Sequence, residues 1–146
     1  MNTTFLNAKE KKQFISECEE QFGSSPGKDL VYFKTSKEDV FIVSRAIEQI
    51  DTTNLRVNSF GLYIAEWKRG VRLSIEGSEL VGKTATKSVV ELSDEETAAW
   101  IKGEDIYKEL PKGVYIIKHG DDFIGCARST EGRLINHVPK TRRIMR

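Results

Sequence analysis

The stretch that decides the fold is residues 113–143, GVYIIKHGDDFIGCARSTEGRLINHVPKTRR. It holds three short apolar runs, residues 114–118, 123–128 and 133–138, separated by the turn sequences Gly-Asp-Asp and Thr-Glu-Gly. β-branched and aromatic residues favour strands, and Gly and Asp favour tight turns. The stretch therefore predicts a three-stranded antiparallel meander that ends at Pro139, which has no N–H for a strand ladder.

The same stretch carries most of the positive charge. From residue 111 onward, eight Lys and Arg face three Asp and Glu, a net charge of +5, whereas residues 1–110 carry −4. The overall charge of +1 hides this polarity. A basic C-terminal region favours a polyanionic partner, although charged strand faces also serve simply to keep a small sheet soluble.

Chain length and composition limit the class of protein. At 146 residues the chain is long enough for one domain or two small ones. It has no apolar run near the roughly 20 residues of a membrane-spanning helix, and no signal-peptide core, so we expect a cytoplasmic protein. Cys18 and Cys126 are far apart and are expected to be reduced core residues, and no His and Cys spacing indicates a metal site.

Upstream of the meander the pattern is mixed. A helix capped by Asn7 and Glu10 is expected to end at Gly23. Strands are expected at residues 30–34, 40–44, 55–57 and 61–67, with a helical turn at 46–50. Residues 89–92 read as a strand, and Ser93 with Glu96 forms the capping box of a helix that places Trp100 in the core and ends at Gly103.

Residues 77–84, GSELVGKT, match the phosphate-loop pattern G-x-x-x-x-G-K-[ST] letter for letter. A working phosphate loop lies between a strand and a long helix, but the β-branched residues that follow here form helices poorly. We expect instead a short helix near residues 75–81 that packs Leu80 and Val81 on the preceding strands. We find no nucleophile, acid–base pair or cofactor-binding glycine pattern and expect no catalytic residue and no cofactor.

The basic positions predict an RNA-binding edge. On a strand, residues two apart share a face, so Arg133, Ile135 and His137 are expected to lie together, with Arg128 on the neighbouring strand. Arg and Lys suit phosphate contact, and Asn and His offer directional groups for a base or a ribose hydroxyl. The predicted RNA-binding residues are Lys68, Arg69, Arg72, Arg128, Arg133, Asn136, His137, Lys140, Arg142 and Arg143.

Residues 88–143 resemble a PUA domain, an RNA-binding module. The helix sequence LSDEETAAWIKGEDI resembles the first PUA helix. The meander is similar to the tail of Sun/Fmu-type RNA 5-methylcytosine methyltransferases, with Ile-Gly at 124–125, Gly-Arg-Leu at 132–134, then Asn136, Pro139, Lys140 and Arg143. The similarity extends upstream to about residue 55, and the catalytic domain of those enzymes has no counterpart in this sequence.

The sequence thus predicts an α+β chain in two parts, a small mixed α/β N-terminal domain at residues 1–84 and a PUA-like β-barrel at 85–146. The resemblance implies a non-catalytic protein that binds tRNA or rRNA in RNA modification or ribosome biogenesis. An RNA-modifying enzyme or a ribosome-assembly factor is a possible partner. Two alternatives remain: an adaptor that docks an RNA-modifying enzyme, and a nucleotide-binding enzyme acting through residues 77–84.

Overall fold

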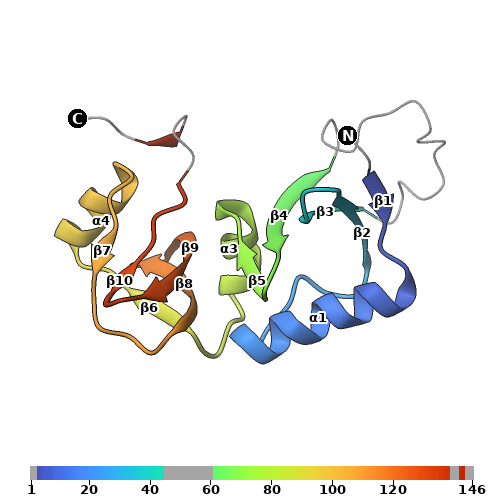
Figure 1. Ribbon diagram of the computed structural model, residues 1–146, viewed down its shortest axis with the longest axis horizontal. Coiled ribbons are helices and arrows are strands. Elements are labelled where there is room, and N and C mark those ends of the chain that lie inside the picture. The colour runs from blue at the N-terminus through green and yellow to red at the C-terminus, as the bar shows by residue number, and fades with distance from the viewer. Residues whose placement is uncertain (1–2, 45–60, 139–141, 144–146) are drawn as a thin grey trace.

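The computed structural model describes residues 3–44, 61–138 and 142–143. It contains two five-stranded sheets that follow one another in the chain, with helix α3 between them (Figure 1). The predicted helical turn at 46–50, the predicted strand at 55–57 and the predicted RNA contact Lys140 lie outside the described residues. No helix among the described residues is both long and apolar enough to cross a membrane.

The first sheet is an antiparallel meander in which neighbouring strands follow chain order. Its strands are β1 (Thr3–Phe5), β2 (Leu30–Thr35), β3 (Asp39–Ser44), β4 (Leu62–Trp67) and β5 (Val71–Leu73). The three predicted strands that fall on described residues are confirmed. The sequence analysis missed β1 and β5, which are too short to show a full period of alternation.

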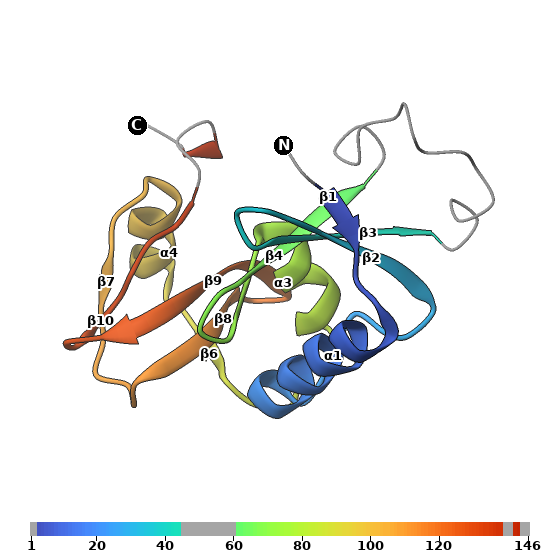
Figure 2. The same cartoon turned by 45° about the vertical axis from the view of Figure 1, so that its right-hand side comes forward.

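Helix α1 (Ala8–Phe22) lies along the first sheet, as the turned view in Figure 2 shows. Its capping box is formed as predicted, because Asn7 Oδ1 accepts from Glu10 N and Glu10 Oε1 accepts from Asn7 N. The helix ends at Gly23 in the left-handed conformation, with φ of 72°. The side chains at helical spacing, Phe14, Cys18 and Phe22, are fully buried against the sheet.

Residues 77–82 of the phosphate-loop pattern lie in helix α3 (Ile75–Gly82), and Lys83 and Thr84 follow its end, so the short helix expected there is confirmed. In a helix the backbone N–H groups bond to carbonyls of the preceding turn and do not cradle a phosphate. Gly77 lies against the backbone of Ile64, and Gly82 lies under the ring of Phe123. The two glycines thus let α3 pack closely between the two sheets. The expectation for Leu80 is wrong, because that side chain points outward and is 38% exposed.

The second sheet is mixed and curls into a half-barrel. Its strand order is β6-β8-β9-β10-β7, and β6 pairs with β8 in parallel while the other pairs are antiparallel. The strands are β6 (Val89–Glu91), β7 (Ile106–Tyr107), β8 (Gly113–His119), β9 (Asp122–Thr130) and β10 (Arg133–Leu134). Two strands of the predicted meander are confirmed. The third is far shorter than predicted, because the chain turns away after Leu134.

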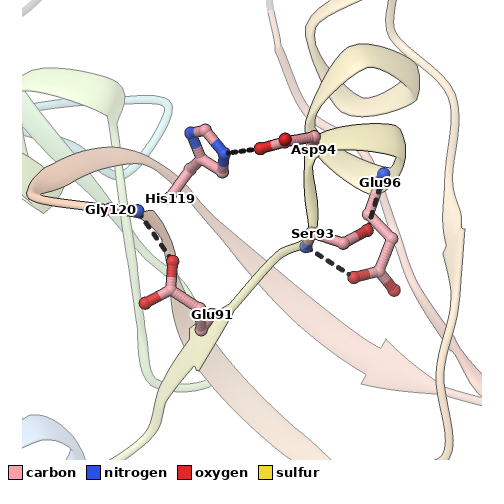
Figure 3. Close-up of polar contacts among 6 residues, drawn as sticks. All are labelled: Glu91, Ser93, Asp94, Glu96, His119 and Gly120. Atoms are coloured by element: carbon pink, nitrogen blue, oxygen red, sulfur yellow. Dashed lines mark hydrogen bonds and ion pairs between the residues drawn. The ribbon is translucent and has the colours of Figure 1, made fainter.

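Helix α4 (Asp94–Ile101) packs on the half-barrel, and its predicted capping box of Ser93 and Glu96 is present. Figure 3 shows the box and two further contacts that tie the turn between β8 and β9 to this end of the helix. His119 Nε2 lies 2.7 Å from Asp94 Oδ1, and Gly120 N donates to Glu91 Oε2. His119 therefore has a structural partner, and Trp100 is buried in the core beneath α4, as predicted.

The hydrophobic core does not divide at the boundary between the sheets. One cluster combines α1 and one face of the first sheet with Ile116 of β8 and Cys126 of β9, while Val31, Phe33 and Val43 form a small cluster of their own. A second cluster fills the half-barrel around Trp100, Ile117 and Leu134. Neighbouring residues on β8 and β9 point to opposite faces, so the second sheet contributes to both clusters. The free thiols Cys18 and Cys126 are both buried in the first cluster, as predicted.

Candidate nucleic-acid interface

Arg128 joins the basic residues of the two halves. It lies near the end of β9, and its guanidinium donates to Lys68 O at 2.8 Å and Arg69 O at 3.3 Å, across 60 and 59 residues of sequence. Those carbonyls belong to the tight turn between β4 and β5, where Gly70 takes a φ of 96°. The turn directs the exposed side chains of Lys68 and Arg69 outward. Arg128 thus has a positioning role that sequence spacing alone did not show.

Arg72 and His137 lie near the contact between Arg128 and the turn at Lys68. The Arg72 side chain is only 13% exposed, and Glu66 Oε2 lies 3.7 Å from its Nη2. Partial burial lowers the pKa of His137 below its usual value, and the charges of Arg72 and Arg128 lower it further. His137 is therefore neutral near pH 7 and offers one hydrogen-bond donor and one acceptor. It follows β10 and is not on a strand, so the expected alternation with Arg133 and Ile135 is not present.

Arg133 pairs with Asp105, and its backbone position places it beside Tyr107. Arg133 Nη1 lies 2.8 Å from Asp105 Oδ2. In the register of the sheet Arg133 stands opposite Thr130 on one side and Tyr107 on the other. Directly opposed residues share a face, so Arg128, Thr130, Arg133 and Tyr107 line the same side of the half-barrel. This is the side that faces the turn at Lys68.

The side chain of Asn136 is fully engaged as a donor. Its Nδ2 donates to Trp100 O and to Glu104 O, both at 2.8 Å, and its Oδ1 accepts from Val138 N at 2.7 Å. Both amide hydrogens are therefore used to hold the chain after β10 against the end of α4. The predicted RNA contact Asn136 thus holds the chain end in place and has no side-chain N–H left for a base.

The basic residues at the C-terminal end of the described chain are also anchored. Arg142 Nη1 lies 2.6 Å from Glu76 Oε2 on α3. Arg143 Nε donates to Val138 O at 3.0 Å, and its side chain passes over Gly103. Both arginines keep their positive charge, but part of the donor capacity of each is used within the protein. Neither adjoins the turn at Lys68 directly in the contacts described.

Tyr107 is the exposed aromatic side chain that the sequence analysis missed. It is 79% exposed, and it lies on the two-residue strand β7, which the sequence analysis did not predict. The neighbouring Ile106 is 5% exposed and belongs to the core around Trp100. The pair Ile106–Tyr107 thus alternates inward and outward, but both residues are apolar, so only the pairing of β7 with β10 shows which side chain points outward.

We use the term basic surface for the face of the protein on which the two halves meet around Arg128. Its members are Lys68, Arg69, Arg72, Arg128, Arg133, His137 and, as its aromatic member, Tyr107. Among the described residues, no group of three or more His, Cys, Asp or Glu side chains is arranged to hold a metal ion.

Comparison with known proteins agrees with this architecture. The half-barrel with its helix is a PUA-like fold, and residues 87–144 match the family model described as the methyltransferase RsmF PUA domain. The chain is also 30% identical over 89 residues to the ribosomal RNA small subunit methyltransferase F of Erwinia tasmaniensis. The second half is therefore a PUA domain similar to the C-terminal region of Sun/Fmu-type enzymes, as the sequence predicted.

The extent of this similarity is partial. The aligned region is 59% of this chain and 19% of the relative, so the chain spans about a fifth of that enzyme's length. The family match covers the PUA domain alone and not the catalytic methyltransferase domain.

Proposed function

We propose that this chain is a non-catalytic RNA-binding protein that acts in rRNA modification through its basic surface. The observation that carries the proposal is the pair of hydrogen bonds from Arg128 to Lys68 O and Arg69 O. They bring the basic turn of the first half and the basic strand ends of the second half onto one face. A PUA domain and a relative named for ribosomal RNA support RNA as the partner.

Phosphate contacts supply most of the affinity in this proposal. Lys68 and Arg69 are exposed on the turn between β4 and β5, so both side chains are accessible to a phosphate. Arg128 holds the turn in place, and Arg133 adds charge on the neighbouring strand. Tyr107 offers an exposed ring on the same side, and base stacking on such a ring is worth about 1–3 kcal/mol.

The test is fluorescence anisotropy with a small-subunit rRNA fragment and a tRNA at several salt concentrations. If about four or five phosphates are contacted, log K falls against log salt with a slope of about −3 to −4. The double variant Lys68→Gln with Arg69→Gln lowers the magnitude of that slope by about 1.4 units. Tyr107→Ala weakens binding and leaves the slope unchanged, because it removes stacking and no charge.

The matched control removes two charges elsewhere. Lys9 and Lys12 are exposed at the start of α1, at the end of the helix away from the half-barrel (Figure 1). Lys9→Gln with Lys12→Gln lowers the net charge equally and should leave the slope unchanged. Equal effects of the two double variants would mean that binding follows net charge alone. Salt-insensitive binding of a protein partner, with no RNA binding, would favour the adaptor function.

A further inference from the structure

A cavity of about 220 Å³ lies where the two halves meet. Tyr63 and Arg72 come to its wall from the first sheet, and Trp100, Gly125 and His137 come from the second half. Sites for drug-sized ligands typically measure about 300–1,000 Å³, so this cavity suits one smaller moiety. Arg72 and His137 also belong to the basic surface, so the cavity is continuous with it.

The polar groups in the wall are mainly donors. The guanidinium of Arg72 has five N–H donors, and the nearest carboxylate oxygen that pairs with it in the described chain lies 3.7 Å away. The carboxylate of Glu76, which also lines the cavity, is already paired with Arg142. A ligand that enters therefore finds the donors of Arg72 that its 3.7 Å contact with Glu66 leaves unused, which favours a group rich in acceptor atoms.

Trp100 carries a polar atom without a partner. Its side chain is 1% exposed, and Nε1 has no hydrogen-bond partner among the described residues. Buried donors are nearly always paired, so an unpaired indole N–H in a cavity wall indicates a missing acceptor. Gly125 lies beside it, and a Cβ at that position would be 3.3 Å from Nε1. A larger residue at position 125 would therefore press on the indole N–H.

We propose that this cavity holds one nucleotide of the bound RNA, turned out of its stack. A carbonyl of the base accepts from Trp100 Nε1, and the phosphate faces Arg72 at the basic surface. Sequence-specific RNA recognition commonly uses bases that are splayed out and packed on aromatic side chains, and Tyr63 supplies such a ring here. The inference rests on the proposed RNA binding and adds to it the class of ligand that the junction accepts.

The experiment follows the indole N–H signals of the full chain in ¹H–¹⁵N spectra. The probes are the four nucleoside 5′-monophosphates, added one at a time. The chain has two Trp, and Trp67 Nε1 already donates to Glu17 Oε1 at 3.1 Å, so its signal serves as an internal reference. We expect the Trp100 signal to move downfield with at least one monophosphate while the Trp67 signal stays in place.

Two variants test the assignment, and each is first shown to be folded by its melting curve. Gly125→Ala fills the space beside the indole N–H and should weaken monophosphate binding at least tenfold. Arg72→Gln removes the charge and should do the same without changing the shape of the wall at Gly125. Gly113→Ala is the control, because the nearest atom to its added Cβ is 3.9 Å away.

RNA anisotropy in parallel separates this inference from the proposed function. Salt-dependent RNA binding with no movement of the Trp100 signal, by RNA or by any monophosphate, overturns the cavity site alone. Unchanged monophosphate affinity in folded Gly125→Ala and Arg72→Gln also overturns it. Monophosphate binding without any RNA binding overturns the proposed function, and with it the RNA nucleotide as the occupant.

Discussion

Gly77→Ala tests whether α3 is pressed against the first sheet as tightly as the structure indicates. A Cβ at position 77 would lie closer than 3.0 Å to the carbonyl oxygen of Ile64, and it would lie 3.0 Å from the carbonyl carbon. Real Cβ atoms essentially never come this close to another atom. Both obstacles are backbone atoms of β4, which no side-chain rotation can move, so the helix or the strand must shift.

The sign of the change in stability shows whether α3 approaches β4 closely or packs on it loosely. In a helix without the clash, Ala is favoured over Gly by about 1 kcal/mol, so the variant would be more stable. Overpacking of a tight contact costs about 1–3 kcal/mol, occasionally more. We expect a clash of about 2–3 kcal/mol to outweigh the gain of about 1 kcal/mol. The net loss of about 1–2 kcal/mol lowers the melting temperature by about 2–8 °C, at roughly 2–4 °C per kcal/mol for a chain of this size.

Two further Gly→Ala variants provide comparisons for the change in melting temperature. Gly82→Ala would meet the ring of Phe123, with Cε1 at 2.9 Å, and a side chain can yield where a backbone cannot. Gly113→Ala meets nothing closer than 3.9 Å. The expected order of destabilisation, measured by thermal unfolding, is therefore Gly77, then Gly82, then Gly113. A Gly77→Ala variant that melts at or above the wild-type temperature would refute the close approach of α3 to β4.

Three other outcomes are expected. Trp100→Ala should cost about 3–5 kcal/mol in urea unfolding, because a fully buried indole is removed from the core. Ser93→Ala should cost about 1 kcal/mol in the same assay, since it removes the cap of α4, and Ser93→Asp should restore most of it. Burial raises the pKa of the Cys18 and Cys126 thiols to about 12, so neither should react with a thiol reagent in the folded protein. Because the unfolded chain loses these protons first, the free energy of unfolding should fall as the pH rises from about 9 towards 12.

The sequence predicted those parts of the fold whose signals are local. The capping boxes at Asn7 and Ser93, the end of α1 at Gly23 and the long strands β8 and β9 depend on residues a few positions apart. The short strands and the parallel pairing of β6 with β8 depend on partners far away in the chain, and no local pattern records them. The third strand of the meander was overestimated because apolar alternation continues past the point where Asn136 anchors the chain to α4.

For the candidate site, too, the sequence predicted only what local signals reveal. The list of basic residues could be read from the sequence, but their division into contact and positioning residues could not. Arg128 and Asn136 look available in the sequence, but the structure shows that both Asn136 N–H donors and part of the Arg128 guanidinium are used within the protein. Tyr107 was not among the predicted RNA contacts, and only its pairing with Arg133 places it on the basic surface.

The core that the two halves share affects how the chain unfolds. Ile116 and Cys126 of the half-barrel are buried in the same cluster as Phe14 and Ile64 of the first half. A PUA domain separated from residues 1–84 would uncover those side chains and present an apolar patch to water, which promotes association. The two halves should therefore unfold in a single cooperative transition, and the second half is not a module that can be grafted onto another protein without the helix and strands that cover it.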